Sequence, residues 1–212
     1  SGTDSITGTT GQVVVVSCDA GYSGGANWTC GTDGNFTGTA CTVNSCSATQ
    51  TANSDFSASN AITGTTGQVV VVSCNAGYSG GVNWTCGTDG NFSGAACTAN
   101  SCTATQTPNS DFSASNAITG TTGQVVAVTC DAGYSGGANW TCGTDGNFSG
   151  AACTASSCTA TQTPNSNFSG TDSITGTTGQ VVVVSCNAGY SGGVNWTCGT
   201  DGNFSGAACT AN

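Results

Sequence analysis

Cysteine is the residue type whose number and spacing could carry chemistry in this chain. The 212 residues include 15 cysteines and neither histidine, lysine nor arginine. From Cys46 onward, successive cysteines follow at steps of 28, 12, 11 and 5 residues, and the series then repeats. A zinc site would be expected to contain histidines or Cys-x-x-Cys pairs, so the pattern indicates disulfide bonds instead. Because disulfides persist in oxidising compartments, we expect a secreted or cell-surface protein.

The cysteine pattern belongs to a longer repeat with a constant period of 56 residues. A near-identical segment starts once per repeat, at Gly11, Gly67, Gly123 and Gly179. The period predicts a partial repeat without its first cysteine and three full repeats. Their ranges are 1–44, 45–100, 101–156 and 157–212. A module of this size is too small for a core alone to be reliably stable, so we expect each bridge to contribute roughly 2–4 kcal/mol.

The charges exclude several classes of function. All ten charged residues are aspartates, and the net charge is −10. With no cation to neutralise phosphate, we expect neither nucleic-acid binding nor attraction to anionic membranes. General acid–base catalysis would have to come from Asp, Tyr or Cys alone. We therefore expect no enzyme, no small-molecule substrate and no cofactor.

Calcium is the one metal for which the sequence offers a ligand. Each repeat contains an Asp-Gly-Asn turn, which begins at Asp33, Asp89, Asp145 or Asp201. A turn of this kind supplies one carboxylate, whereas a calcium site needs six to eight oxygens. We expect plain turns and no metal site.

Short β-strands are the elements that must position the cysteines. Val13–Val16 is a β-branched run flanked by glycines, too short for a comfortable helix. Asn27–Cys30 alternates polar and apolar residues, as in a strand with one buried face. No segment shows an amphipathic helical period. No apolar segment is long enough to span a membrane as a helix. The expected fold class is all-β: a tandem array of small disulfide-stapled modules. Linkers of only four residues between them predict a stiff, elongated rod.

The spacing of cysteine, glycine and aromatic residues resembles the sushi, or complement control protein, module along the whole chain. In the second repeat the matching residues are Cys46, Gly67, Val69, Val71, Cys74, Gly77, Tyr78, Gly80, Thr85, Cys86, Gly90, Phe92 and Cys97. Two features depart from the family pattern. No proline precedes the fourth cysteine, and phenylalanine replaces the usual core tryptophan at Phe36, Phe92, Phe148 and Phe204.

The resemblance implies a disulfide pairing that spacing alone does not choose, because four cysteines allow three pairings. Sushi modules join the first cysteine to the third and the second to the fourth. This implies the bonds Cys46–Cys86, Cys74–Cys97, Cys102–Cys142, Cys130–Cys153, Cys158–Cys198, Cys186–Cys209 and, in the partial repeat, Cys18–Cys41. Cys30 is left unpaired or intermolecular. Either the sequence is a segment of a longer array, which we favour, or a neighbouring subunit supplies the partner in a head-to-tail fibre.

Asn-x-Ser/Thr sequons form a second repeated motif. They occur at Asn27, Asn35, Asn83, Asn91, Asn139, Asn147, Asn167, Asn195 and Asn203. Eight of the nine form one Asn-Trp-Thr and one Asn-Phe-Ser/Thr sequon per repeat, in which the apolar middle residue is expected to face inward. Either these asparagines carry N-linked glycans, or a composition rich in Asn, Ser and Thr has produced one accident that the repeat copies.

The valine runs predict an apolar stripe. If Val14 and Val16 face the core, alternation places the neighbouring valines on the outer face. The stripe comprises Val13, Val15, Val69, Val71, Val125, Val181 and Val183, with Ala127 in the third repeat. Either both faces of this strand are covered within a module, or the repeated stripe is a contact surface for self-association.

Two functions fit these patterns. The first is a structural extracellular repeat protein, a subunit or segment of a glycosylated filament, fibre or stalk, because near-identical copies present the same surface at every step. The alternative is a sushi-type cell-surface module for adhesion or ligand binding. Such recognition surfaces use charged and aromatic residues that differ between modules, whereas these copies are nearly identical. We therefore expect self-association as the main interaction.

Overall fold

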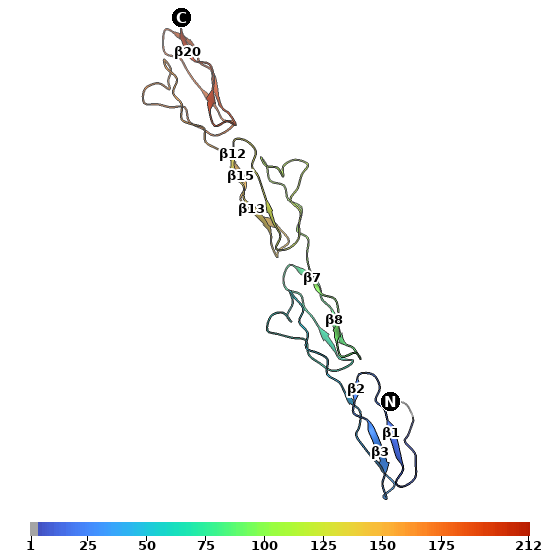
Figure 1. The fold of residues 1–212 in the computed structure, drawn as a ribbon. Helices are drawn as coiled ribbons and strands as arrows, with labels where there is room; N and C mark the ends of the chain where they lie inside the picture. Colours follow the sequence, from blue (N-terminus) through green and yellow to red (C-terminus); the bar gives the residue numbers. More distant parts are fainter. Residues whose placement is uncertain (1–3) are drawn as a thin grey trace. The chain divides into compact units, whose positions relative to one another are not determined.

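The computed structural model describes residues 4–212, and all regular secondary structure in that range is β-structure (Figure 1). Residues 1–3 of the predicted first repeat lie outside the described range. The chain divides into two compact units, Ser1–Ala99 and Asn100–Asn212. Each unit contains two copies of one strand arrangement. Between residues 4 and 212, no helix is long and apolar enough to cross a membrane.

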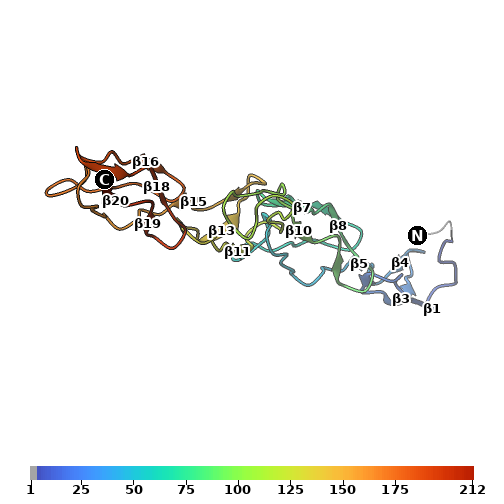
Figure 2. The ribbon, with the colours of Figure 1, turned by 90° about the horizontal axis from the view of Figure 1, so that it is seen from above.

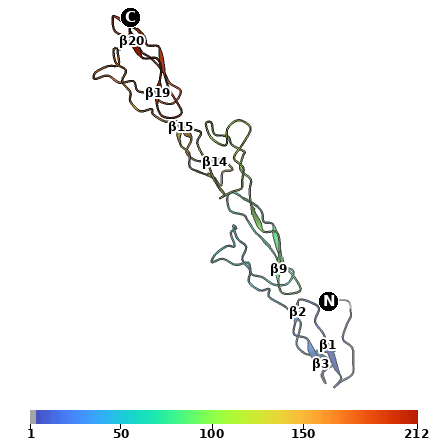
Figure 3. The same cartoon turned by 45° about the horizontal axis from the view of Figure 1, so that its top comes forward.

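The first copy consists of two small antiparallel sheets. A three-stranded sheet has the order β1-β3-β4, and a two-stranded sheet pairs β2 with β5. The strands are β1 (Val13–Val16), β2 (Tyr22–Ser23), β3 (Ala26–Cys30), β4 (Phe36–Thr37) and β5 (Thr42–Val43). Strands β1 and β3 lie side by side in Figures 1 and 3. Strand β1 consists only of β-branched valines, which fit a pleated surface well.

The second copy, in the same unit, repeats this topology. Its sheets have the orders β6-β8-β9 and β7-β10. The strands are β6 (Val69–Val71), β7 (Tyr78–Gly80), β8 (Asn83–Cys86), β9 (Phe92–Ser93) and β10 (Cys97–Ala99). The chain turns between β8 and β9 at Gly90, whose φ of 80° is readily adopted only by glycine.

The second unit contains two further copies with the same strand orders. The third copy consists of β11 (Val125–Ala127), β12 (Tyr134–Gly136), β13 (Asn139–Cys142), β14 (Phe148–Ser149) and β15 (Cys153–Ala155). The fourth consists of β16 (Val181–Val183), β17 (Tyr190–Gly192), β18 (Asn195–Cys198), β19 (Phe204–Ser205) and β20 (Cys209–Ala211). Figure 2 shows the three-stranded sheet of this last copy, in the order β16-β18-β19.

Each of the last three copies has a small core of its own. In the second copy, Ile62 is fully buried, and Val72, Trp84 and Phe92 pack with it around Cys86, which is 1% exposed. The same positions form the cores of the third and fourth copies, except that Trp140 of the third copy is only partly buried and packs against its core. Phe92, Phe148 and Phe204 are therefore core residues at the position where the sushi pattern has tryptophan, whereas Phe36 of the first copy is only half-buried.

Seven disulfides close the copies. The bonded pairs are Cys18–Cys41, Cys46–Cys86, Cys74–Cys97, Cys102–Cys142, Cys130–Cys153, Cys158–Cys198 and Cys186–Cys209. These are the pairs that the sushi resemblance implied. Among the described residues, Cys30 is the one free cysteine, and it is only 5% exposed. Its counterparts Cys86, Cys142 and Cys198 are all bonded.

Within the first unit, a single linker residue is hydrogen-bonded to both copies. The backbone N–H of Asn44 donates to the carbonyl of Gly21 in the first copy, at 2.9 Å. The Asn44 carbonyl accepts from the backbone N–H of Thr66 in the second copy, at 2.9 Å, and from the Thr66 hydroxyl, at 3.3 Å. The linker is therefore fixed at both ends.

The second unit contains the same junction at Ser156. Its N–H donates to the Gly133 carbonyl at 2.8 Å, and its carbonyl accepts from the N–H of Thr178 at 2.9 Å. The Thr178 hydroxyl also donates to the Gly133 carbonyl, at 2.7 Å. These bonds directly tether the third copy to the fourth.

The junction glycines allow a matched test of these contacts. A Cβ on Gly21 would lie 2.4 Å from Cγ2 of Thr66, and one on Gly133 would lie 2.8 Å from Cα of Thr200, whereas a Cβ on Gly189 meets no described atom within 4 Å. All three glycines have φ between 84° and 86°. Gly21→Ala and Gly133→Ala should therefore open the junction at an overpacking cost of about 1–3 kcal/mol. Gly189→Ala is the control, because it introduces the strain of a positive φ at a non-glycine residue but no steric clash.

Amide hydrogen exchange at Asn44 and Ser156 measures the opening of the two junctions. We expect faster exchange at Asn44 in Gly21→Ala and at Ser156 in Gly133→Ala, with both amides unchanged in Gly189→Ala. Equal exchange in all three variants would show that the junctions do not constrain the chain.

Candidate functional site

The outward face of the three-stranded sheet is the candidate site, because it brings the predicted valine stripe and the predicted sequons together. In the second copy, Val71 of β6 is the direct antiparallel partner of Asn83 of β8, and Val69 is the partner of Thr85. On the other side of β8, Thr85 is opposite Ser93 of β9. These five side chains all lie on exposed positions of the same sheet. Sequence reasoning had not placed the valines and the sequons next to each other.

The same face occurs in the other three copies. The cross-strand partners of the sequon asparagines form the pairs Val15–Asn27, Ala127–Asn139 and Val183–Asn195. The partners of the sequon threonines form the pairs Val13–Thr29, Val125–Thr141 and Val181–Thr197. The valines are strongly exposed: in the second copy, Val71 is 66% exposed and Val69 is 49% exposed. The alternative that this strand is covered on both faces within a module is therefore wrong.

The tryptophan of the Asn-Trp-Thr sequon fixes which way the asparagine points. Trp84 is 9% exposed, lies in the core and donates its indole N–H to the Ala95 carbonyl at 3.1 Å. Because side chains alternate along a strand, its neighbours Asn83 and Thr85 face solvent. Trp28, Trp140 and Trp196 donate the same hydrogen bond to Thr39, Ala151 and Ala207. Asn27, Asn83, Asn139 and Asn195 are thus exposed in-strand positions.

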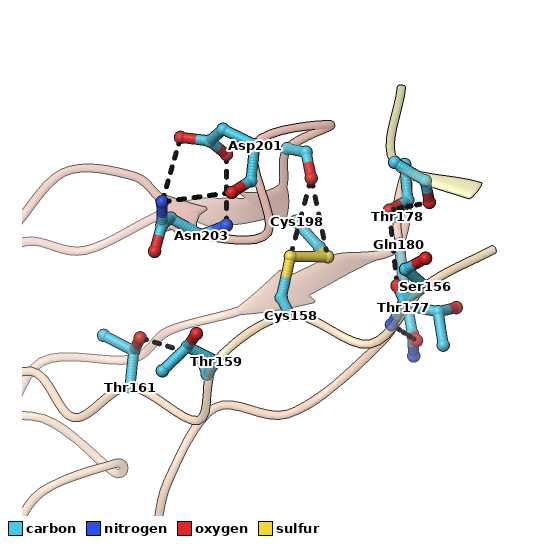
Figure 4. The surroundings of a disulfide bond; sticks show 12 residues. Ser156, Cys158, Thr159, Thr161, Thr177, Thr178, Gln180, Cys198, Asp201 and Asn203 are labelled. Atoms are coloured by element: carbon cyan, nitrogen blue, oxygen red, sulfur yellow. Dashed lines mark hydrogen bonds between the residues drawn. A yellow bond between two sulfur atoms is a disulfide. The ribbon is translucent and has the colours of Figure 1, made fainter. Parts of the chain in front are cut away.

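The second sequon of each copy lies in a hydrogen-bonded turn. Asn91 donates its backbone N–H and its side-chain Nδ2 to the carboxylate of Asp89, each at 3.1 Å. Its Nδ2 also donates to the Asp89 carbonyl, at 3.4 Å. Asn35, Asn147 and Asn203 make the same pair of bonds to Asp33, Asp145 and Asp201. Figure 4 shows the pair Asp201 and Asn203 close to the disulfide Cys158–Cys198.

The ninth sequon, Asn167, has a structural role. Its Oδ1 accepts the backbone N–H of Ser185 at 2.9 Å. In the second and third copies, Asp55 and Asp111 make this bond at the corresponding position. Asn167 therefore replaces an aspartate that holds two loops together.

In the range 4–212 there is no group of three or more His, Cys, Asp or Glu side chains placed to hold a metal. One hollow, lined by Val16, Ser17, Asp19, Tyr22 and Cys41, contains a single carboxylate. The structure also exposes apolar side chains that sequence reasoning missed, namely Val43, Val82 and Val194. Their signal is weak, because two of them stand next to glycines rather than in a β-branched run.

Comparisons with protein-family models and with curated proteins find no match to this chain. The chain is a tandem disulfide-rich β-repeat protein, and its likeness to the sushi module remains a resemblance of cysteine spacing and motif.

The Asp–Asn turns make stability depend on pH. The pKa of Asp89 is lowered from its ordinary value, first by the hydrogen bond from the Asn91 side chain and then by the Asn91 backbone N–H. Asp33, Asp145 and Asp201 are shifted the same way for the same reasons. A carboxyl whose pKa is lowered on folding stabilises the protein above its unfolded pKa, near 3.9, and this contribution is lost as the pH falls through the folded pKa.

We therefore expect the variant with Ala at all four turn aspartates to unfold at a lower temperature than the wild type at neutral pH. The difference should shrink towards zero as the pH falls below about 4. Asp131→Asn is the control for removing an aspartate outside these turns, because the corresponding positions of the second and fourth repeats, 75 and 187, already contain asparagine. A gap that stays constant between about pH 7 and pH 2 would contradict the role of these carboxylates.

Proposed function

We propose that this chain is a structural extracellular repeat protein without enzymatic activity, a segment or subunit of a glycosylated filament, fibre or stalk built from sushi-like modules. The observation that carries the proposal is the repetition of one exposed face, on β6 and β8 in the second copy, at the same place in all four copies. A surface that recurs with as little variation as Ala127 in place of valine suits assembly along an axis better than recognition of one ligand.

Two further observations support the proposal. Seven disulfides stabilise modules with very small cores, as is typical of proteins that work in oxidising surroundings outside the cell. The junctions at Asn44 and Ser156 tether neighbouring copies within each unit through backbone hydrogen bonds. Fixed junctions favour a load-bearing array, whereas freely jointed modules would favour independent binding domains.

Self-association belongs to the same proposal. Because the sequence repeats with a period of 56 residues, any surface of one repeat recurs at every step, and two copies can make the same contact at each of them. We expect neither nucleic acid nor an inserted membrane among the partners, because the chain has no cation.

Electron microscopy of the full chain, secreted from eukaryotic cells and kept under oxidising conditions, tests the proposal. We expect regular fibres or uniform elongated particles that lengthen with protein concentration. Sedimentation over the same concentrations provides the quantitative measure. Monodisperse particles at every concentration would favour the sushi-type adhesion or binding module, and collapsed particles without a preferred shape would overturn the structural role.

A further inference from the structure

The in-strand sequon and the exposed valines occupy adjacent sites on one face of each sheet. Residues directly opposite each other on antiparallel strands have Cβ atoms about 4.5–5.5 Å apart. Val71 has this relation to Asn83, and Val69 has it to Thr85, two residues further along the same sequon. A group attached to the Asn83 side chain would therefore rise from the sheet beside the methyl groups of two half-exposed or exposed valines.

The side-chain amide of Asn83 is available for such a group. Among the described contacts it makes no side-chain hydrogen bond, and the buried Trp84 beside it holds the strand with Asn83 facing outward. Asn91 differs, because its Nδ2 donates both to the carboxylate and to the carbonyl of Asp89. At Asn83, a group attached to Nδ2 would replace no described hydrogen bond. At Asn91, it would remove one of the two N–H donors of Nδ2 that bind Asp89.

The chemistry of an N-linked glycan fits this face. Its first sugar, N-acetylglucosamine, has an apolar ring face of C–H groups and an N-acetyl methyl group. Covering a valine that is 66% exposed removes apolar surface from water, which stabilises the contact. The hydroxyls of such a sugar would remain in water.

We propose that Asn27, Asn83, Asn139 and Asn195 carry N-linked glycans whose first sugar packs on the valines of the neighbouring strand. This inference rests on the extracellular part of the proposed function, because the sugar is added during secretion. In that step, Nδ2 of asparagine bonds to C1 of an oligosaccharide on a lipid diphosphate carrier. The C1–O bond to the diphosphate breaks, the diphosphate leaves with the electron pair, and Nδ2 loses one proton.

In this proposal a sugar of the same chain, and not a second copy of the chain, covers the valine stripe. The sugar is attached to the strand next to the valines, so it covers them at every protein concentration. Apolar pairs that recur every repeat would otherwise remain in water on an edge strand, which is a hazard for aggregation. Self-association of the glycosylated chain would then use surfaces other than this stripe.

The third copy provides a natural control. Ala127 replaces valine opposite Asn139, while Val15, Val71 and Val183 occupy that position in the other copies. The sugar on Asn139 therefore has one valine fewer to cover. Its contact with the sheet should be weaker than the contact at Asn27, Asn83 and Asn195.

Site occupancy is the first test. The full chain is secreted from eukaryotic cells, and its peptides are treated with an amidase that cleaves N-glycans in ¹⁸O water, so that each occupied asparagine becomes a labelled aspartate. We expect the label at all four in-strand asparagines. Unmodified asparagine at these positions in the secreted protein would overturn the proposal.

The contact itself is tested by a cycle of variants. The first variant carries Val15→Ser, Val71→Ser and Val183→Ser. The second removes the in-strand sequons but keeps their asparagines, through Thr29→Ala, Thr85→Ala, Thr141→Ala and Thr197→Ala. We expect the valine substitutions to lower the unfolding temperature at least twofold more in the glycosylated chain than in the sequon-free chain. Ala127→Ser, as the control, should have the same effect in both. Equal effects of the valine substitutions would contradict the packing.

Two further readouts make the outcomes decisive. If the valine variant does not fold, nuclear Overhauser effects between valine methyls and N-acetyl protons in the unsubstituted glycoprotein test the contact. Their absence would overturn it.

If the valines instead bind a second copy of the chain, the glycosylated chain will sediment as an oligomer that the valine substitutions dissociate. That result would also contradict the proposal. Fibres with unmodified asparagines would refute this inference alone. Occupied, valine-coupled glycans on a chain that never assembles would refute only the filament.

Discussion

The disulfides are the constraint on which the rest of each module depends. In the second copy, Cys86 is almost fully buried between Ile62, Trp84 and Phe92, so the bond to Cys46 is part of the core itself. The two bonds of a full copy join cysteines 40 and 23 residues apart. By loop-closure entropy each stabilises the fold by roughly 3–4 kcal/mol, which is a large share of the stability of any small domain.

The core of the second copy covers only one face of its three-stranded sheet. Trp84 and Cys86 fill the inner face, and Asn83, Thr85 and the valines of β6 are left outside. Because the chain repeats this solution at a fixed period, the exposed face recurs with it. The alternation of buried and exposed residues in β8 thus produces both the small core and the repeated outer surface.

The sequence predicted the strands and the facing of their residues more fully than it predicted the site. Alternation in Asn83–Cys86 indicated the buried tryptophan and the outward asparagine, because a strand has a period of two. It did not predict that Val71 pairs with Asn83, since the connection between β6 and β8 has no standard hairpin turn to set the register. Nor did it predict Ile62, which is buried outside any named strand, or the left-handed backbone of Ala58, where the fourth copy has Gly170.

Reduction of the full chain without denaturant is the most direct test of the central claim that the disulfides hold the fold. Thiol counting should give one reactive cysteine per unfolded chain before reduction, Cys30, and all 15 after it. We expect the reduced chain to lose amide chemical-shift dispersion, and the emission of Trp84 and Trp196 to shift to the red as their cores open to water. A reduced chain that keeps native dispersion and tryptophan emission would contradict the claim that the disulfides hold the fold.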